Sequence, residues 1–327
     1  MIISRTPLRI SFAGGGSDLR SYYQTGYGAV VSTAINKYVY VMVNDKFDDY
    51  IRVSYSKTEL AHHVDEIEHN IIRESLKMVG GVERGIDIVY MVDVLPVQYG
   101  TGLGVSSSIT VGTLKALYAY KRLQVSTETI ARQACEIEMD ILQTPAGKQD
   151  QYCAAYGGIN YIQFNADESV VVEPLEISRQ TKDQMENNLM LFYTGLHQDS
   201  GTILSEQRSK TAQNLDQIGQ MVGMAQSLRD DLAADRLPCL GQTMHEGWLR
   251  KRKLASSITL PFIDEQYEIA LNAGATGGKL LGSGGGGFLL FYCEPEKQAS
   301  VRSALSELKE MSFQLEPEGA KLVYAPE

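Results

Sequence analysis

The pattern of apolar and polar positions predicts strands mainly in the first part of the chain. Residues 8–13 alternate, and residues 29–43 are rich in Val, Ile, Thr and Tyr, which fits two strands or one bent strand. Residues 158–164 and 169–173 fit a hairpin. Similar patterns predict the remaining strands at 85–94, 189–193, 288–292 and 321–324.

Helical spacing of apolar residues separates these strands. It covers 65–79, 106–123 and a stretch to Leu142 for which Ser126 is the expected N-cap. Residues 201–254 are mostly helical with one interruption at 237–238, and a last helix precedes the final strand. Early strands cluster before the helices, which favours an α+β fold over a doubly wound parallel sheet. We place a tight boundary near 177–187, giving units 1–180 and 181–327.

Composition narrows the class of protein. The 327 residues are 43% hydrophobic and 21% charged, an ordinary globular balance. A net charge of −10 argues against a dedicated nucleic-acid binder, although backbone amides can still bind phosphate. Four distant cysteines without a CxxC pair indicate a reduced, cytoplasmic protein without structural zinc. Neither a signal peptide nor an apolar run of roughly 20 residues is apparent, so we expect no membrane partner.

One glycine cluster carries the first chemical signal. A strand leads into a loop ending Gly102-Leu103-Gly104, and Ser106, Ser107 and Ser108 open the next helix. Free amides and the positive end of the helix dipole meet there and can bind phosphate. The alternative is an ordinary glycine turn with a serine N-cap. The loop lacks the lysine of a Walker A motif, and its glycine spacing differs from the dinucleotide-binding fingerprint.

Three further segments accompany this loop. Gly14–Asp18 follows the strand that carries Arg9. The glycines between 282 and 287 predict close backbone packing against a ligand or against this first loop, rather than a flexible loop. Asp150 follows a Pro/Gly turn, where its carboxylate could accept a hydroxyl proton or hold Mg²⁺. An Asx-turn or helix cap is the alternative for Asp150.

Together, the three glycine clusters resemble the motifs of the GHMP small-molecule kinases, the superfamily of galactokinase, homoserine kinase and mevalonate kinase. Residues 7–14 resemble the first motif, 95–108 the second and 279–288 the third, in the family's order. The runs at 14–18, 147–151 and 277–279 are similar to those of D-glycero-D-manno-heptose 7-phosphate kinases. L-fucokinase-like enzymes share much of this pattern.

The resemblance implies a fold and a reaction. The fold would have an N-terminal domain like ribosomal protein S5 domain 2, a ferredoxin-like C-terminal domain and an ATP site between them. The reaction would phosphorylate the anomeric (C1) hydroxyl of heptose 7-phosphate with ATP and Mg²⁺, for nucleotide-activated heptose synthesis, and a homodimer is left open. The alternatives are a fucokinase-like or other sugar 1-kinase, a catalytically idle ligand sensor and, more distantly, a nicotinamide dehydrogenase.

The resemblance also implies roles for individual residues. Asp150 would act as base or orienting acceptor, Arg9 would neutralise charge beside it, and Asp18 would bind sugar hydroxyls. Mg²⁺ would lie on Glu138 and Ser106, with Ser107 as the alternative serine because Val105 departs from the family pattern. The expected nucleotide-binding residues are Gly100, Gly102, Leu103, Gly104, Ser106, Ser107 and Ser108. The expected substrate-binding residues are Gly14, Gly15, Gly16, Ser17, Asp18, Gly284 and Gly285.

Each role has a structural alternative. Glu138 could be a solvated helix residue, Arg9 could form a structural ion pair, and Asp18 could cap a helix that begins at Leu19. The basic run 250–253 is typical of a solvated helix face. A substrate that carries its own phosphate needs a second basic site, which one or two of these residues could supply.

Overall fold

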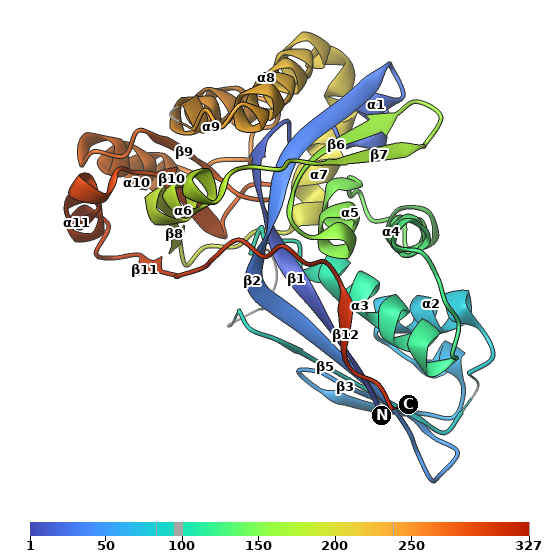
Figure 1. Cartoon of the computed structure of the whole chain (residues 1–327). Coiled ribbons are helices and arrows are strands. Elements are labelled where there is room, and N and C mark those ends of the chain that lie inside the picture. Colours follow the sequence, from blue (N-terminus) through green and yellow to red (C-terminus); the bar gives the residue numbers. More distant parts are fainter. Residues whose placement is uncertain (83, 95–100, 238, 327) are drawn as a thin grey trace.

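We describe the fold from a computed structural model, which describes residues 1–82, 84–94, 101–237 and 239–326 (Figure 1). Within these residues the strands form two sheets. The first has the order β12-β1-β2-β5-β3-β4, with β6 paired to β2 and β7 to β6. The second has the order β11-β8-β10-β9.

The strands of the first sheet are β1 (Ile2–Ala13), β2 (Tyr27–Asp45), β3 (Ile51–Ser54), β4 (Thr58–Ala61), β5 (Ile86–Val92), β6 (Ile159–Asn165), β7 (Val170–Pro174) and β12 (Lys321–Tyr324). Those of the second sheet are β8 (Leu189–Tyr193), β9 (Gly277–Leu280), β10 (Phe288–Tyr292) and β11 (Lys309–Glu310). The α-helices are α1 (Arg20–Tyr23), α2 (Asn70–Val79), α3 (Val105–Tyr120), α4 (Thr127–Cys135), α5 (Gln149–Tyr156), α6 (Arg179–Asn188), α7 (Ser200–Ser209), α8 (Leu215–Ala233), α9 (Cys239–Lys251), α10 (Pro261–Asn272) and α11 (Pro295–Ala304). Shorter turns of helix are η1 (Val64–Glu66), η2 (Glu136–Ile141) and η3 (Thr211–Gln213).

The 19-residue strand β2 is the backbone of the first sheet. Its beginning pairs with β6 and its end with β5, so one strand serves two neighbours on the same side. Its pairing with β1 slips where Pro7 faces Tyr38 and Leu8 faces Ile35. Proline cannot donate a backbone hydrogen bond, which fits a slip at this point. The interpretation of 29–43 as one bent strand is confirmed, and the two-strand alternative is wrong.

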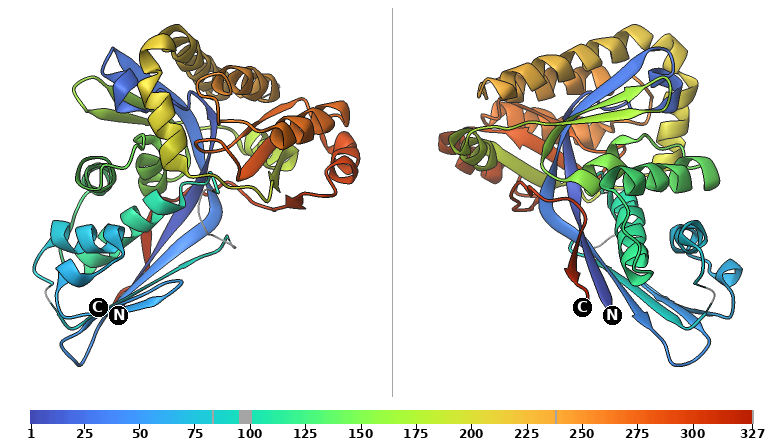
Figure 2. Two further views of the ribbon diagram at one scale, coloured as in Figure 1. Left: turned by 180° about the vertical axis from the view of Figure 1, so that it is seen from behind. Right: turned by 45° about the vertical axis from the view of Figure 1, so that its right-hand side comes forward.

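Helices cover the first sheet and connect it to the second. Helix α3 packs on β1 and β2, and α2, α4 and α5 pack around α3. Helix α8 contacts β1, β2 and β6, while α9 contacts both β9 and β1 and so joins the two sheets. Figure 2 shows α8 and α9, in gold, along one end of β2. The strand β12 pairs with β1, so the chain's last strand belongs to the first sheet.

Burial explains why several elements were predictable. Every residue of β10 and four of five in β8 are buried, which accounts for their uninterrupted apolar runs. The hairpin of β6 and β7 is confirmed, and Ser126 accepts the amide hydrogen of Thr129 as the N-cap of α4. The α+β fold class is confirmed.

The predicted helix from Ser126 to Leu142 is present, although its last six residues, η2, are a π-helix, a form often found at functional sites. Other local predictions were wrong or incomplete. The helical region 201–254 is broken at 210–214 as well as before α9. The short strands β3, β4 and β9 and the helices α6 and α10 had no predicted counterpart.

All four cysteines are free thiols. Across the described part of the chain, no helix has the length and apolar character required to cross a membrane.

Candidate active site

The strand β1 and the helix α5 bring Arg9 and Asp150 together. The Arg9 Nε atom donates to Asp150 Oδ1 over 2.8 Å, and Nη2 donates to Oδ2 over 2.7 Å. This is the parallel two-bond geometry in which a guanidinium holds a carboxylate most firmly. Arg9 is 3% exposed, whereas the Asp150 side chain keeps 27% exposure. Arg9 therefore fixes the direction of a carboxylate that a ligand can still reach.

The second glycine loop lies directly against this pair. Arg9 donates through Nη1 to the Gly102 carbonyl, and its backbone amide donates to the Leu103 carbonyl. A Cβ at Gly104 would lie 3.2 Å from the Arg9 side chain and 3.4 Å from Asp150 Oδ2. Gly104, in the left-handed region at φ 75°, is the N-cap of α3. The free amides at the start of α3 and the Asp150 carboxylate therefore share one small region, as the glycine-loop hypothesis requires.

The three serines after this loop have different surroundings. Ser107 is buried and its hydroxyl donates to Glu138 Oε2 over 2.9 Å. Ser108 is buried and donates to the Pro7 carbonyl, which ties α3 to β1. Ser106 is exposed. The interpretation of a serine N-cap is wrong, since Gly104 occupies the cap and no side chain caps α3.

Glu138 lies on the π-helix η2 and points inward. It is 4% exposed, so the solvated-residue alternative is wrong. Burial raises the pKa of its carboxyl to about 7, although the nearby hydroxyls of Thr110 and Ser107 oppose that shift. Gln151 donates to Oε2 over 3.0 Å, but Oε1 has no hydrogen-bond partner among the described residues. A buried oxygen of this kind is suited to a cation.

The first glycine loop holds Asp18 beside the same region. Asp18 Oδ1 accepts the Gly16 amide hydrogen over 2.9 Å. Burial raises the pKa of the Asp18 carboxyl, and the negative charge of Asp150 adds to that rise. Helix α1 has Leu19 as its N-cap, without a side-chain hydrogen bond. The alternative that Asp18 caps this helix is therefore wrong.

Two buried lysines line the same cavity from the opposite side. Lys251 is 6% exposed and donates to the Gly282 carbonyl, and burial lowers the pKa of its ammonium to about 8. Lys279 is 4% exposed, and burial together with the charges of Lys251 and Arg9 lowers its pKa strongly. The prediction of a solvated helix face for 250–253 is thus wrong at Lys251.

The third glycine loop packs against the second. A Cβ at Gly282 would lie 2.4 Å from the Gly102 Cα, so a side chain is excluded there. Gly282 and Ser283 also line the cavity that holds Asp150, together with Gly15, Gly16 and Asp18. The prediction of close packing is confirmed, but the immediate neighbour of Gly282 is the second loop rather than the expected first loop.

Some expected residues lie elsewhere. Gly14 faces the Ala29 backbone, and Ser17 exchanges two 3.0 Å hydrogen bonds with Ala29. Gly284 faces Ile258, and Gly285 faces Ile203 and Gln198. These four residues are not in the lining of the Asp150 cavity. The expected nucleotide contact at Gly100 lies outside the described residues.

Other polar residues at the site were not assigned from the sequence. Gln149 accepts from Ser11 over 2.8 Å and donates to Asp150 Oδ1 over 3.3 Å. Gln207 reaches the Ser283 carbonyl over 3.2 Å. Gln149 and Gln151 flank Asp150 in the chain, and that repeated amide was an available signal.

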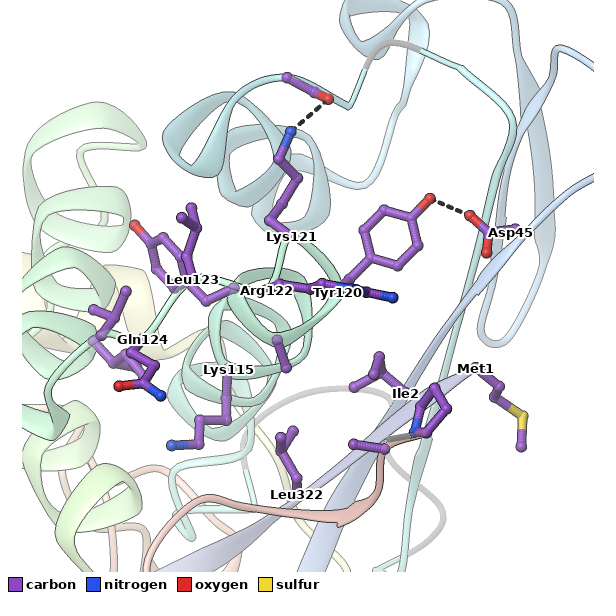
Figure 3. Close-up of a pocket in the computed structure, with 17 residues that line it drawn as sticks. Met1, Ile2, Asp45, Lys115, Tyr120, Lys121, Arg122, Leu123, Gln124 and Leu322 are labelled. Carbon is purple, nitrogen blue, oxygen red and sulfur yellow. Dashed lines mark hydrogen bonds between the residues drawn. The ribbon is translucent and has the colours of Figure 1, made fainter.

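A larger cavity, of about 860 Å³, lies at the other end of α3 (Figure 3). Its Asp45 already accepts from the Tyr120 hydroxyl, and Lys121 donates to the Gly81 carbonyl. None of the three glycine loops contributes to its lining. The smaller cavity at Asp150 is therefore the candidate active site.

Comparison with known proteins identifies the family. The model of the GHMP kinases N terminal domain matches residues 69–158, and that of the GHMP kinases C terminal domain matches residues 228–310. The chain belongs to the GHMP kinases. The first match spans the second glycine loop, Glu138 and Asp150. The second spans Lys251 and the third glycine loop.

Individual relatives cover nearly the whole chain. A D-glycero-alpha-D-manno-heptose 7-phosphate kinase of Campylobacter jejuni is 27% identical over 317 residues, 93% of each chain. The bifunctional fucokinase/GDP-fucose pyrophosphorylase of Arabidopsis thaliana is 25% identical over 94% of this chain but 31% of its own length. The crystal structure of a D-glycero-D-manno-heptose 1-phosphate kinase from Bacteroides thetaiotaomicron superimposes with a TM-score of 0.83, at 26% identity and full coverage of both chains. The chain is thus an ATP-dependent kinase of this family.

Proposed function

We propose that this kinase transfers the γ-phosphoryl group of ATP to the anomeric C1 hydroxyl of D-glycero-D-manno-heptose 7-phosphate, which yields the 1,7-bisphosphate. The observation that carries the proposal is the oriented Asp150 carboxylate, held by Arg9 beside the N-terminus of α3. Similarity to heptose phosphate kinases supports the acceptor. The names of those two relatives place the phosphate at different positions, and we choose the 7-phosphate because it leaves the C1 hydroxyl free.

In this mechanism the amides between Gly102 and Ser108 bind the ATP phosphates. The oxygen of the C1 hydroxyl forms a bond to the γ-phosphorus while the bond between that phosphorus and the leaving oxygen of ADP breaks. Asp150 accepts the proton of the C1 hydroxyl in this step. Arg9 orients Asp150 and offsets negative charge. Asp18 accepts hydrogen bonds from sugar hydroxyls. Lys251 and Lys279 offset the negative charge of the phosphoryl group during its transfer.

Magnesium fits the donors present. Mg²⁺ prefers oxygen ligands, takes one or two from the protein and keeps waters. Glu138 offers its unpartnered Oε1, and the Ser107 hydroxyl lies beside it. We therefore propose Glu138 with Ser107 as the metal ligands, in place of the expected Ser106. When bound, the ion would neutralise phosphate charge.

A panel assay tests the acceptor. ADP release is measured with heptose 7-phosphate, the unphosphorylated heptose, L-fucose and galactose, each at matched concentrations. We expect kcat/KM for heptose 7-phosphate to exceed the other values by about 10²-fold or more, since a site built for a charged group rejects analogues that lack it. Preference for L-fucose would instead support the second candidate, a fucokinase, which the similarity to the Arabidopsis thaliana protein favours.

A further inference from the structure

The cavity at Asp150 is too small for the whole proposed acceptor. Its volume is about 90 Å³, whereas small-molecule sites usually measure roughly 300–1,000 Å³. A seven-carbon sugar phosphate with its C1 hydroxyl at Asp150 must therefore extend into a neighbouring space. A second cavity, of about 500 Å³, shares Leu19 and Ala146 with the first. This second cavity is defined here as the side cavity.

Helix α7 links the two cavities through neighbouring side chains. Leu204 and Gln207 line the Asp150 cavity, and Arg208 lines the side cavity. Residues 204, 207 and 208 lie on one face of the helix, because positions three and four apart coincide on a helical surface. Figure 2 shows α7, in yellow, running from the α1 end of the molecule toward its centre. An acceptor that contacts Gln207 in the Asp150 cavity and extends into the side cavity would thus contact Arg208.

Arg208 differs from the other arginine of the side cavity. Arg20 is held by Asp140 at 2.6 Å and by Glu168 at 3.1 Å. The exposed Arg208 side chain has neither an ion pair nor a hydrogen bond to any residue that the structure describes. Asp140 also lines the side cavity, but its charge is offset by Arg20. The side cavity therefore presents one arginine fork without an acidic partner.

We propose that the side cavity binds the 7-phosphate of the acceptor, with Arg208 as its main ligand and Arg20 as a second donor. A guanidinium presents paired N–H donors that match two phosphate oxygens. The buried lysines Lys251 and Lys279 are less suited to this end of the substrate, because they line the Asp150 cavity, where phosphoryl transfer occurs. This inference rests on the proposed function and identifies the residue that distinguishes a sugar phosphate from a free sugar.

The test compares Arg208→Gln with the wild-type chain on heptose 7-phosphate and on unphosphorylated heptose. We expect the variant's KM for heptose 7-phosphate to rise roughly 10- to 100-fold, the usual worth of a hydrogen bond to a charged group. Its kcat/KM for the free heptose and its KM for ATP should stay within about twofold. Arg208→Lys keeps the charge but loses the paired N–H donors. Its KM for heptose 7-phosphate should lie between those of the wild-type chain and Arg208→Gln.

Arg179→Gln is the matched control, since Arg179 is an exposed arginine on α6 that does not line either cavity. It should leave every constant unchanged. If the wild-type chain does not turn over heptose 7-phosphate, the proposed function fails and this inference fails with it. If the wild-type chain does so but Arg208→Gln matches it, or loses both acceptors equally, only the side-cavity inference is overturned.

Discussion

The two sides of the active site carry opposite charges, and the charged groups on the two sides have different hydrogen-bond partners. One side is built on α5, on η2 and on the loop between β1 and α1. It supplies the carboxylates Asp150 and Asp18, which line the cavity, and Glu138, which lies outside its lining. Each carboxylate has at least one donor: the guanidinium of Arg9, the Gly16 amide and the hydroxyl of Ser107, respectively. The side built on α9 and β9 supplies the ammonium groups of Lys251 and Lys279. Of these, Lys251 bonds only a backbone carbonyl, and neither lysine has an ion pair among the described residues.

The difference between the two sides indicates that the carboxylates orient the acceptor and that the lysines balance the charge of a ligand. The carboxylates are held in place before any ligand arrives, whereas the lysines are buried without carboxylate partners and have lowered pKa values. A buried charge without a partner is costly, and an anionic ligand would offset that cost. The acidic side therefore directs the acceptor hydroxyl, and the basic side offsets the charge of the transferring phosphoryl group. Three substitutions test this difference between the two sides.

Asp150→Asn should have the largest effect. Without a proton acceptor beside the C1 hydroxyl, we expect kcat to fall about 10²- to 10⁴-fold while the affinity for ATP is nearly kept. Single-turnover ADP release and calorimetry with an ATP analogue measure the two quantities. A variant with wild-type turnover would show that Asp150 does not accept the proton.

Glu138→Gln should change how stability depends on pH. The folded pKa of Glu138, about 7, lies above the ordinary value of 4.5, so the folded chain binds more protons than the unfolded chain between these pH values. Stability from this group is therefore present at low pH and is lost as the pH rises from about 4.5 to 7. Relative to Glu138→Gln, the wild-type chain should lose about 3 kcal/mol between pH 4 and pH 8 without Mg²⁺.

The measurement is urea unfolding of both chains at several pH values in the presence of EDTA. Gln is a suitable replacement because its carbonyl can still accept from Ser107 and Gln151. Parallel pH profiles for the two chains would contradict a raised pKa at this position. With Mg²⁺ present, the wild-type loss at pH 8 should shrink, because an ion at Oε1 stabilises the ionised carboxylate.

Lys251→Met should have the smallest effect of the three, a fall of about tenfold in kcat, because Lys251 offsets charge on the transferring phosphoryl group. The pKa of Lys251 is about 8, so its positive charge is present below that pH and is lost above it. The wild-type kcat should accordingly fall as the pH passes through 8, and the kcat of the variant should be low and flat. A wild-type kcat that is constant from pH 7 to 9 would show that this charge does not act on the phosphoryl group.

The residues of the acidic side were easier to predict from the sequence than those of the basic side. Strands with long apolar runs, such as β8 and β10, were predictable because both faces are buried. The Arg9–Asp150 pair and the Glu138 carboxylate followed from a family resemblance, since spacing in the chain does not reveal that residues 141 positions apart share a salt bridge. The buried state of Lys251 was missed because the run 250–253 has the composition of an exposed helix.

The side cavity and the proposed metal ligands Glu138 and Ser107 depend on contacts between residues that are far apart in the chain. In the sequence, nothing distinguishes Arg208 from the other arginines. In the structure, its side chain lines the side cavity with Leu19 and Ala146 and has no partner among the described residues. The choice between Ser106 and Ser107 depends on which hydroxyl faces Glu138. Ser107 is buried and donates to that carboxylate, whereas Ser106 is exposed, and the sequence does not show this difference.

The contact between Gly102 and Gly282 restricts how this kinase can be recombined with its relatives. Each glycine is already the smallest residue, so enlargement at one position has no compensating reduction at the other. Chimaeras that join the first half of one family member to the second half of another should therefore assemble only when the first parent carries the equivalent of Gly102 and the second parent the equivalent of Gly282. The pair gives protein engineers a simple compatibility rule for choosing crossover partners.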